Sequence, residues 1–211
     1  MKAQKTVLAW HFVKDDGTNR DGIKEKIGQW YKVEGEIVPC QRGLHGSVRP
    51  LDALEFAPGL ILRRTEHRGT IVEHNDDKIA SSERRALWQI DATKLLHLFA
   101  CWAAENALKD AKVTDERCWK AIKIKRQWLG KKATDEELAA ASDAASDAAS
   151  DAARAASDAA SAAAWDAARD AASDAAWAAW DAASAAAREK MNKKLTAMAM
   201  AAGRSKRGEK K

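Results

Sequence analysis

The spacing of hydrophobic and polar residues divides the chain into parts with different patterns. Over residues 1–91, short apolar and β-branched runs alternate with Gly and charged clusters, a pattern typical of short strands. The predicted strands are 6–13, 29–33, 35–40, 43–48, 60–64, 70–73 and 84–90. Pro50 suits the first turn of a short helix that ends at Phe56, ahead of Pro58 and Gly59. Residues 1–91 are therefore predicted to form a small α+β domain.

The next segment has the pattern of helices. Residues 92–109 are apolar nearly all round, which predicts a buried helix. A second helix is predicted over 114–130, with Thr114 as its N-cap and Gly130 as its end. Thr134 and Glu137 have the spacing of a capping box that begins a further helix. We expect residues 92–132 to form a helical pair that packs on the α+β domain.

Residues 139–187 form a low-complexity repeat of the type Asp-Ala-Ala-X, with 29 Ala and 8 Asp and with neither Gly nor Pro. Ala is the best helix former, so the repeat is predicted to be helical. The average spacing of its Asp residues is slightly longer than the helical period of about 3.6 residues per turn. The row of Asp side chains therefore shifts gradually around the helix. The drift divides the repeat into two blocks that meet near 161–165, where a bend costs least. Residues 133–202 are thus predicted to be an all-α, Ala-rich arm, either a long helix or part of a helical bundle.

A few larger side chains interrupt the arm. Near its end, Met191, Leu195 and Met198 share one helical face. We expect this face to pack against another helix, either from the same chain or from a second copy, so that the arm supports self-association. The large side chains elsewhere in the repeat are Trp165, Trp177 and Trp180.

Charge is distributed unevenly along a chain with a net charge of +5. The repeat is acidic, and the basic stretch 203–211 that follows it is predicted to be disordered. On the polar face of the helix predicted over 114–130, cations surround an indole: Trp119, Lys120, Lys123 and Arg126. Such a set is typical of a surface that stacks bases or binds phosphate, and the basic tail could likewise contact nucleic acid or an acidic partner. A Trp among cations is more often packed against a neighbouring helix with Lys stems lying over it.

Other features narrow the class of protein. The 3 Cys lack metal-ligand spacing, so we expect reduced thiols and no metal site. Long apolar runs are absent, so we expect no membrane partner and a location in the cytoplasm of a bacterial host. Nucleotide-binding glycine motifs and the common hydrolase motifs are absent as well. His67 and His74 are predicted to flank a turn and to be solvated.

Three short motifs carry a resemblance to a known family. They are the strand Gly43-Leu-His-Gly-Ser47, the helix Pro50-Leu-Asp-Ala53 and the segment Asp77-Lys-Ile-Ala-Ser81. Together they resemble an uncharacterised domain family common in bacteriophages and prophages. The Ala-rich region is similar to helical regions of the same proteins, some of them named as immunity proteins. The resemblance implies an accessory protein of a mobile element that binds a phage or host protein, including a component of host defence, with the Ala-rich helix as scaffold.

The order of these elements is also similar to the core of ADP-ribosyltransferases. That likeness implies NAD as cofactor, and without it no cofactor is expected. It places Glu83 as the catalytic acid that stabilises the oxocarbenium-like centre. It places four residues around the nicotinamide: His11, His45, Ser47 and Phe56. The first strand departs from the pattern because it lacks the residues that normally bind the dinucleotide. In the alternative reading, His45 makes a structural hydrogen bond and Glu83 is a surface charge.

Overall fold

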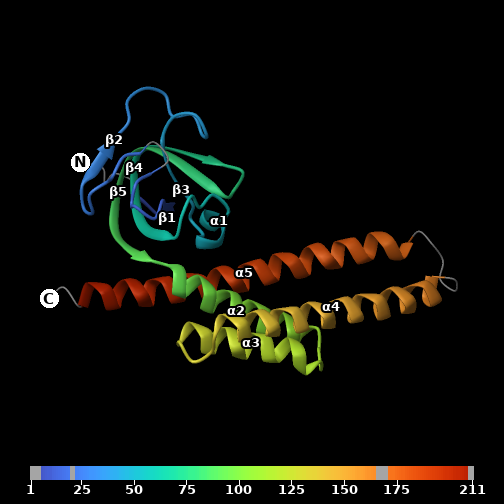
Figure 1. Ribbon diagram of the computed structural model, residues 1–211. Helices are drawn as coiled ribbons and strands as arrows, with labels where there is room; N and C mark the ends of the chain where they lie inside the picture. The colour runs from blue at the N-terminus through green and yellow to red at the C-terminus, as the bar shows by residue number, and fades with distance from the viewer. Residues whose placement is uncertain (1–5, 20–21, 165–170, 209–211) are drawn as a thin grey trace. The chain divides into compact units, whose positions relative to one another are not determined.

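The computed structural model describes the backbone of residues 6–19, 22–164 and 171–208, and the side chains of these residues outside 152–184. The chain forms two compact units. We call residues 1–95 with 189–211 the sheet unit, and residues 96–188 the helical unit. The predicted fold class is confirmed, since an antiparallel sheet with a short helix precedes the helices α2–α5 (Figure 1).

The sheet unit contains five strands that pair antiparallel in the order β1-β4-β5-β2, with β3 paired to β5. Their bounds, with the helix α1, are β1 Val7–Val13, β2 Trp30–Lys32, β3 Leu44–Gly46, α1 Pro50–Glu55, β4 Ile61–His74 and β5 Lys78–Asp91. The strand predicted over 35–40 is wrong, because that stretch contributes only an isolated bridge from Val38 to Arg42.

The strands predicted over 60–64 and 70–73 are parts of the single long strand β4. The predicted break covered residues 65–69, a polar stretch that ends at Gly69. In the fold, Gly69 and Thr70 form an irregularity in the pairing of β4 with β5, where Gly69 has a φ of +78° and the Thr70 amide donates to Ser82 Oγ. The interruption is therefore absorbed within one hairpin.

The sheet curls so that its strands meet. β3 pairs with the first part of β5, and just after β3 the residues Ser47 and Trp10 exchange two backbone hydrogen bonds of 2.7 and 2.9 Å with each other. β1, β4, β5 and β3 thereby enclose an interior. Alternate residues of β4 point into it, and Arg63, Thr65 and His67 are each at most 1% exposed.

The C-terminal part of α5 (Ala171–Gly208) belongs to the sheet unit. Leu195 is fully buried there, and the Leu51 amide of α1 donates to Asn192 Oδ1 at 3.0 Å. Gly203 lies so close to Trp88 of β5 that a Cβ atom would be 2.8 Å from the indole. We predicted that this face packs against another helix, from the same chain or from a second copy. In the structure this part of α5 contacts the short helix α1 and the strand β5 of the same unit.

The helical unit begins within α2 (Thr93–Asp110) and continues through α3 (Glu116–Leu129) and α4 (Asp135–Ala164). The capping box is confirmed, since the Thr134 amide donates to Glu137 Oε2 at 2.8 Å and the Glu137 amide donates to Thr134 Oγ1 at 3.2 Å. At α3 the prediction is wrong by one residue. Asp115, not Thr114, is the N-cap, because its carboxylate accepts the Arg117 amide.

The repeat is helical where it is described. α4 ends at Ala164 and α5 begins at Ala171, so the described backbone forms two helices that adjoin the junction predicted near 161–165. Trp165 and the side chains of Trp177 and Trp180 lie outside the described residues. The tail prediction is wrong for residues 203–208, because α5 continues through Gly208. Among the described helices, none is both long and apolar enough to span a bilayer.

Candidate functional site

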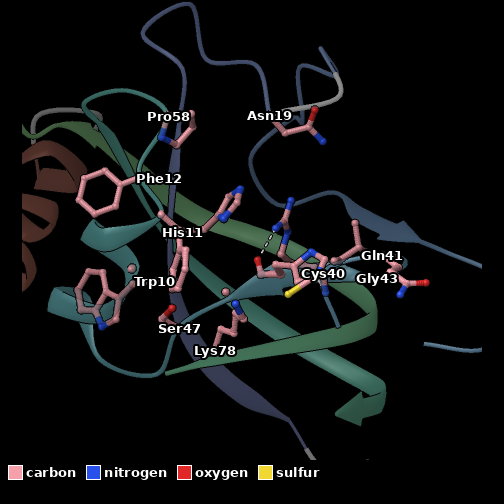
Figure 2. Close-up of a pocket in the computed structure, with 16 residues that line it drawn as sticks. Trp10, His11, Phe12, Asn19, Cys40, Gln41, Gly43, Ser47, Pro58 and Lys78 are labelled. Carbon is pink, nitrogen blue, oxygen red and sulfur yellow. Dashed lines mark hydrogen bonds between the residues drawn. The ribbon is translucent and has the colours of Figure 1, made fainter. Parts of the chain in front are cut away.

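The sheet unit has a pocket of about 310 Å³ between β1, β3, α1 and the segment that precedes β3 (Figure 2). Its walls combine nitrogen-bearing side chains with apolar ones such as Phe56 and Pro58. The polar residues that matter for its chemistry are His11, His45, Ser47, Lys78 and Arg84. Asp and Glu are absent from the described residues that line it.

The glycines of the Gly43–Ser47 motif allow β3 to form one wall of this pocket. At Gly46, a Cβ atom would lie 2.8 Å from His67 Nε2 and 3.0 Å from the Cβ of Ala9. At Gly43, φ is +143°, a conformation that side-chain-bearing residues rarely adopt. The motif that carried the family resemblance thus has a local physical reason, which is the close approach of β3 to β1 and β4.

The structure brings together the four residues predicted to surround a nicotinamide. His11, His45, Ser47 and Phe56 all line the pocket. Glu83, the predicted catalytic acid, is not among the lining residues. Its carboxylate accepts the Arg68 guanidinium Nε–H at 2.7 Å, and its side chain is 22% exposed. The pocket and the proposed acid are therefore two separate features of the unit.

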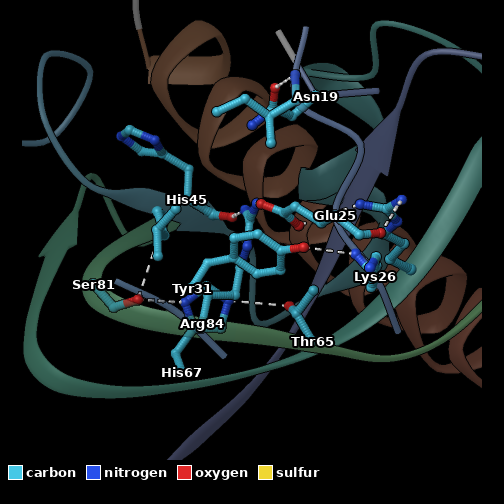
Figure 3. A network of polar contacts seen from close by, with 12 residues as sticks. Asn19, Glu25, Lys26, Tyr31, His45, Thr65, His67, Ser81 and Arg84 are labelled. Atoms are coloured by element: carbon cyan, nitrogen blue, oxygen red, sulfur yellow. Dashed lines mark hydrogen bonds and ion pairs between the residues drawn. The ribbon is translucent and has the colours of Figure 1, made fainter. Parts of the chain in front are cut away.

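A buried charge cluster adjoins the pocket through Arg84, which lines it (Figure 3). The Glu25 carboxylate is shared by two guanidinium groups, those of Arg63 at 3.2 Å and of Arg84. All three side chains are at most 3% exposed. Two cations share one carboxylate, so the cluster carries one excess positive charge in a site with little access to water.

Within the described part of the chain, Arg84 Nε and His11 Nε2 are buried nitrogen atoms of pocket-lining residues without a hydrogen-bond partner. Arg84 donates through one terminal nitrogen to the His45 carbonyl at 2.6 Å and through the other to Glu25. Its Nε is buried and has no hydrogen-bond partner among the described residues. The same holds for His11 Nε2. Desolvation, followed by the positive charge of Arg84, lowers the pKa of His11 well below its ordinary value.

His67 corrects a prediction, because it is fully buried rather than solvated. Its ring lies between two hydroxyl groups, at 3.0 Å from Thr65 Oγ1 and 2.8 Å from Ser81 Oγ (Figure 3). Burial, with the nearby Arg84 charge, lowers the pKa of His67 to about 3. The sequence did contain a sign of this burial, because Arg63, Thr65 and His67 alternate along β4 and so point to the same, inner side of the sheet. Their polar character hid that pattern.

The helical unit has a second hollow, of about 410 Å³, lined by Trp119, Lys123, Arg126 and Glu105. The Trp119 indole N–H donates to the Val113 carbonyl at 2.9 Å, and Arg126 pairs with Glu105 at 2.5 Å. Three of the four predicted surface residues thus lie together. Lys120 is exposed and is not among the lining residues.

The spacing of Cys40 and His45 has a structural role in the loop before β3. The Cys40 amide donates to His45 Nε2 at 3.1 Å. Within the part of the chain that the structure describes, no group of three or more His, Cys, Asp or Glu residues is arranged to hold a metal ion.

Comparison with known proteins gives one match. Residues 7–98 match a family model described as a domain of unknown function, DUF7666. The match extends from β1 into α2 and includes the residues of the sheet-unit pocket. No curated protein and no solved structure matches the chain. The resemblance to an uncharacterised domain family is confirmed at this level, for the first part of the chain.

Proposed function

We propose that the protein is an accessory protein of a bacteriophage or another mobile element that acts in the host cytoplasm by binding a host component. In this proposal the pocket of the sheet unit holds the ligand, and the Ala-rich helices are a scaffold. Components of host defence are among the targets that fit such a protein. The match of residues 7–98 to a domain of unknown function is compatible with this role and does not favour a particular target.

One observation carries the proposal: the described lining is rich in groups that can bind a ligand and lacks the carboxylate that the transferase alternative needs. Imidazole, hydroxyl, ammonium and guanidinium groups line it, and the described lining contains no carboxylate. The transferase alternative requires a carboxylate beside the reacting sugar carbon. Glu83 instead pairs with Arg68 away from the lining residues. A binding role uses every feature of the pocket without that missing carboxylate.

The test uses a substitution that fills the mouth of the pocket. Gln41 is exposed and lines the pocket, whereas Gln29 is exposed and does not. Full-length wild type, Gln41→Trp and Gln29→Trp proteins are incubated with extract of a bacterial host, and the retained molecules are identified by mass spectrometry. We expect wild type and Gln29→Trp to retain a component that Gln41→Trp loses.

Two results would refute the proposal. One is that all three proteins retain the same components, which would make the pocket irrelevant to binding. The other is turnover of NAD by the wild type that Glu83→Gln abolishes while the melting temperature stays unchanged. That second result would establish the transferase alternative.

A second candidate function is binding of nucleic acid by the helical unit. It is favoured by the hollow in which Trp119, Lys123 and Arg126 meet. Binding of single-stranded DNA and RNA would be measured at several salt concentrations for Lys123→Gln and for Lys112→Gln, an exposed control outside the hollow. Selective loss with Lys123→Gln, and a lower salt dependence, would support this candidate. Equal affinity in both variants would exclude this surface.

A further inference from the structure

We infer that the sheet-unit pocket binds a compact organic phosphate, no larger than a mononucleotide, through Arg84, His11 and Lys78. The inference rests on the proposed function in one respect, namely that this pocket is a ligand site. It goes further by naming the chemistry of the ligand. The supporting observations are the charge adjoining the pocket, the unpartnered nitrogen atoms of its lining, and its size.

The first observation is the unbalanced charge. Arg63 and Arg84 share the single carboxylate of Glu25, and all three side chains are almost completely buried. Among the described residues, the remaining acceptors of the two guanidinium groups are neutral oxygens, such as Gln89 Oε1 and the His45 carbonyl. An uncompensated charge in a site that excludes water is strongly disfavoured. An anion in the adjoining pocket would neutralise it.

The second observation is that nitrogen atoms next to the pocket have capacity to donate. Arg84 Nε carries a proton and has no acceptor among the described residues, although the residue is only 2% exposed. His11 Nε2 is also buried without a partner, and a neutral imidazole donates when its proton is on this nitrogen. Buried donors normally have acceptors. Both residues line the same pocket, so one acceptor group could serve both.

The third observation concerns Lys78 and the absence of competing charge. Lys78 comes from the start of β5 and lines the pocket, with its Nζ 4.4 Å from the centroid of the Phe56 ring. It adds a second full positive charge to a described lining without Asp or Glu. A phosphate offers three terminal oxygens that accept strong hydrogen bonds, which matches donors that come from β1 and from the start and the middle of β5. A ligand with no negative charge would not compensate the excess positive charge of the Arg63–Glu25–Arg84 cluster.

The size of the pocket limits the rest of the ligand. Its volume of about 310 Å³ lies at the low end of ligand pockets, which span roughly 300–1,000 Å³. A dinucleotide exceeds this space, whereas a mononucleotide or a smaller phosphate ester fits the scale. Apolar residues of the wall, including Leu44, Ala53 and Pro58, would contact the organic part.

The experiment compares ligands that differ only in the phosphate. AMP, adenosine and inorganic phosphate are titrated into full-length protein by isothermal calorimetry. The variant Lys78→Gln removes one positive charge from the pocket. The control Lys32→Gln removes the same charge from an exposed position on β2 that does not line the pocket. Lys78→Arg, which keeps the charge, reports whether a loss in Lys78→Gln comes from charge or from misfolding.

We expect AMP to bind wild type at least about tenfold more tightly than adenosine, and inorganic phosphate to compete with it. Lys78→Gln should weaken AMP by about tenfold, while Lys32→Gln and Lys78→Arg should stay near wild type. The inference is overturned if AMP does not bind, if adenosine binds as tightly, or if Lys32→Gln weakens AMP as much as Lys78→Gln. Equal binding of adenosine would leave the proposed binding function standing, because that function fails only in the comparison of Gln41→Trp with Gln29→Trp.

Discussion

Acidification should destabilise the sheet unit because His67 is buried as a neutral group, and the substitution His67→Gln should remove this dependence on pH. The imidazole is fully buried, and its pKa is lowered from 6.5 to about 3 by burial. In the unfolded chain the same group titrates at its ordinary value. Between these two values the unfolded state binds a proton that the folded state does not, so stability is full above the unfolded value and falls as the pH drops toward 3.

The magnitude follows from the width of that window. Each pH unit inside it costs about 1.4 kcal/mol. The pKa of His67 in the unfolded chain is 6.5, so lowering the pH from 7 to 5 covers about 1.5 pH units of that window. His67 alone should therefore lower the free energy of unfolding of the sheet by about 2 kcal/mol. In His67→Gln this pH-dependent loss is absent. The variant is less stable than wild type at pH 7, because the hydrogen bonds with Thr65 and Ser81 are weakened.

The assay must report on the sheet separately from the helices. Hydrogen–deuterium exchange by mass spectrometry, corrected for the intrinsic effect of pH, gives the free energy of opening for peptides from β4 and β5. The quantity of interest is the stability difference between wild type and variant at pH 7 minus that at pH 5. We expect about 2 kcal/mol for His67→Gln, and near zero for His74→Gln, at the less buried end of β4. The reasoning is refuted if the two histidine variants give the same value.

Two further predictions concern packing and capping. Gly203→Ala should destabilise the sheet unit by about 1–3 kcal/mol because the added methyl group meets Trp88, whereas Gly208→Ala, with open space around it, should not; their melting temperatures check this. Thr134→Ala should destabilise α4 by about 1 kcal/mol because the capping box is lost, whereas Thr114→Ala should have a much smaller effect because Thr114 is not a cap. Amide exchange in the first turn of α4 measures this, and faster exchange in both variants would contradict the prediction.

The sequence predicted best those elements whose signals are local. The start of α4 follows from Thr134 and Glu137 alone, because both partners of the capping box are within one turn. The end of α3 at Leu129 follows from Gly130 in the same way. The buried face around Leu195 was also readable, since it depends only on helical spacing. Its contacts with α1 and β5 were not, because a periodic pattern does not specify which surface covers it.

The long hairpin of β4 and β5 was missed because its interior is polar. Arg63, Thr65 and His67 occupy inward positions that a hydrophobic pattern would assign to solvent. Their burial depends on partners far along the chain, such as Glu25 for Arg63. The pocket was reached in part through the likeness to ADP-ribosyltransferases, which placed His11 and His45 together. Lys78 was noticed only as part of the Asp77–Ser81 motif, and Arg84 was not singled out. Their place in the pocket depends on the fold, which brings residues of β1, β3 and β5 to one lining.

The charged interior gives the strongest reason to regard the pocket as functional. A buried ion pair contributes little net stability, since desolvation offsets most of the Coulomb attraction, and an apolar set of similar volume is often as stable. A cluster with two cations and one carboxylate is less favourable still. Folding alone therefore does not explain why Arg63, Glu25 and Arg84 occupy the interior of a small sheet. A site in which Arg84 and His11 present unpartnered nitrogen atoms does explain it, because the charge is then directed at a ligand.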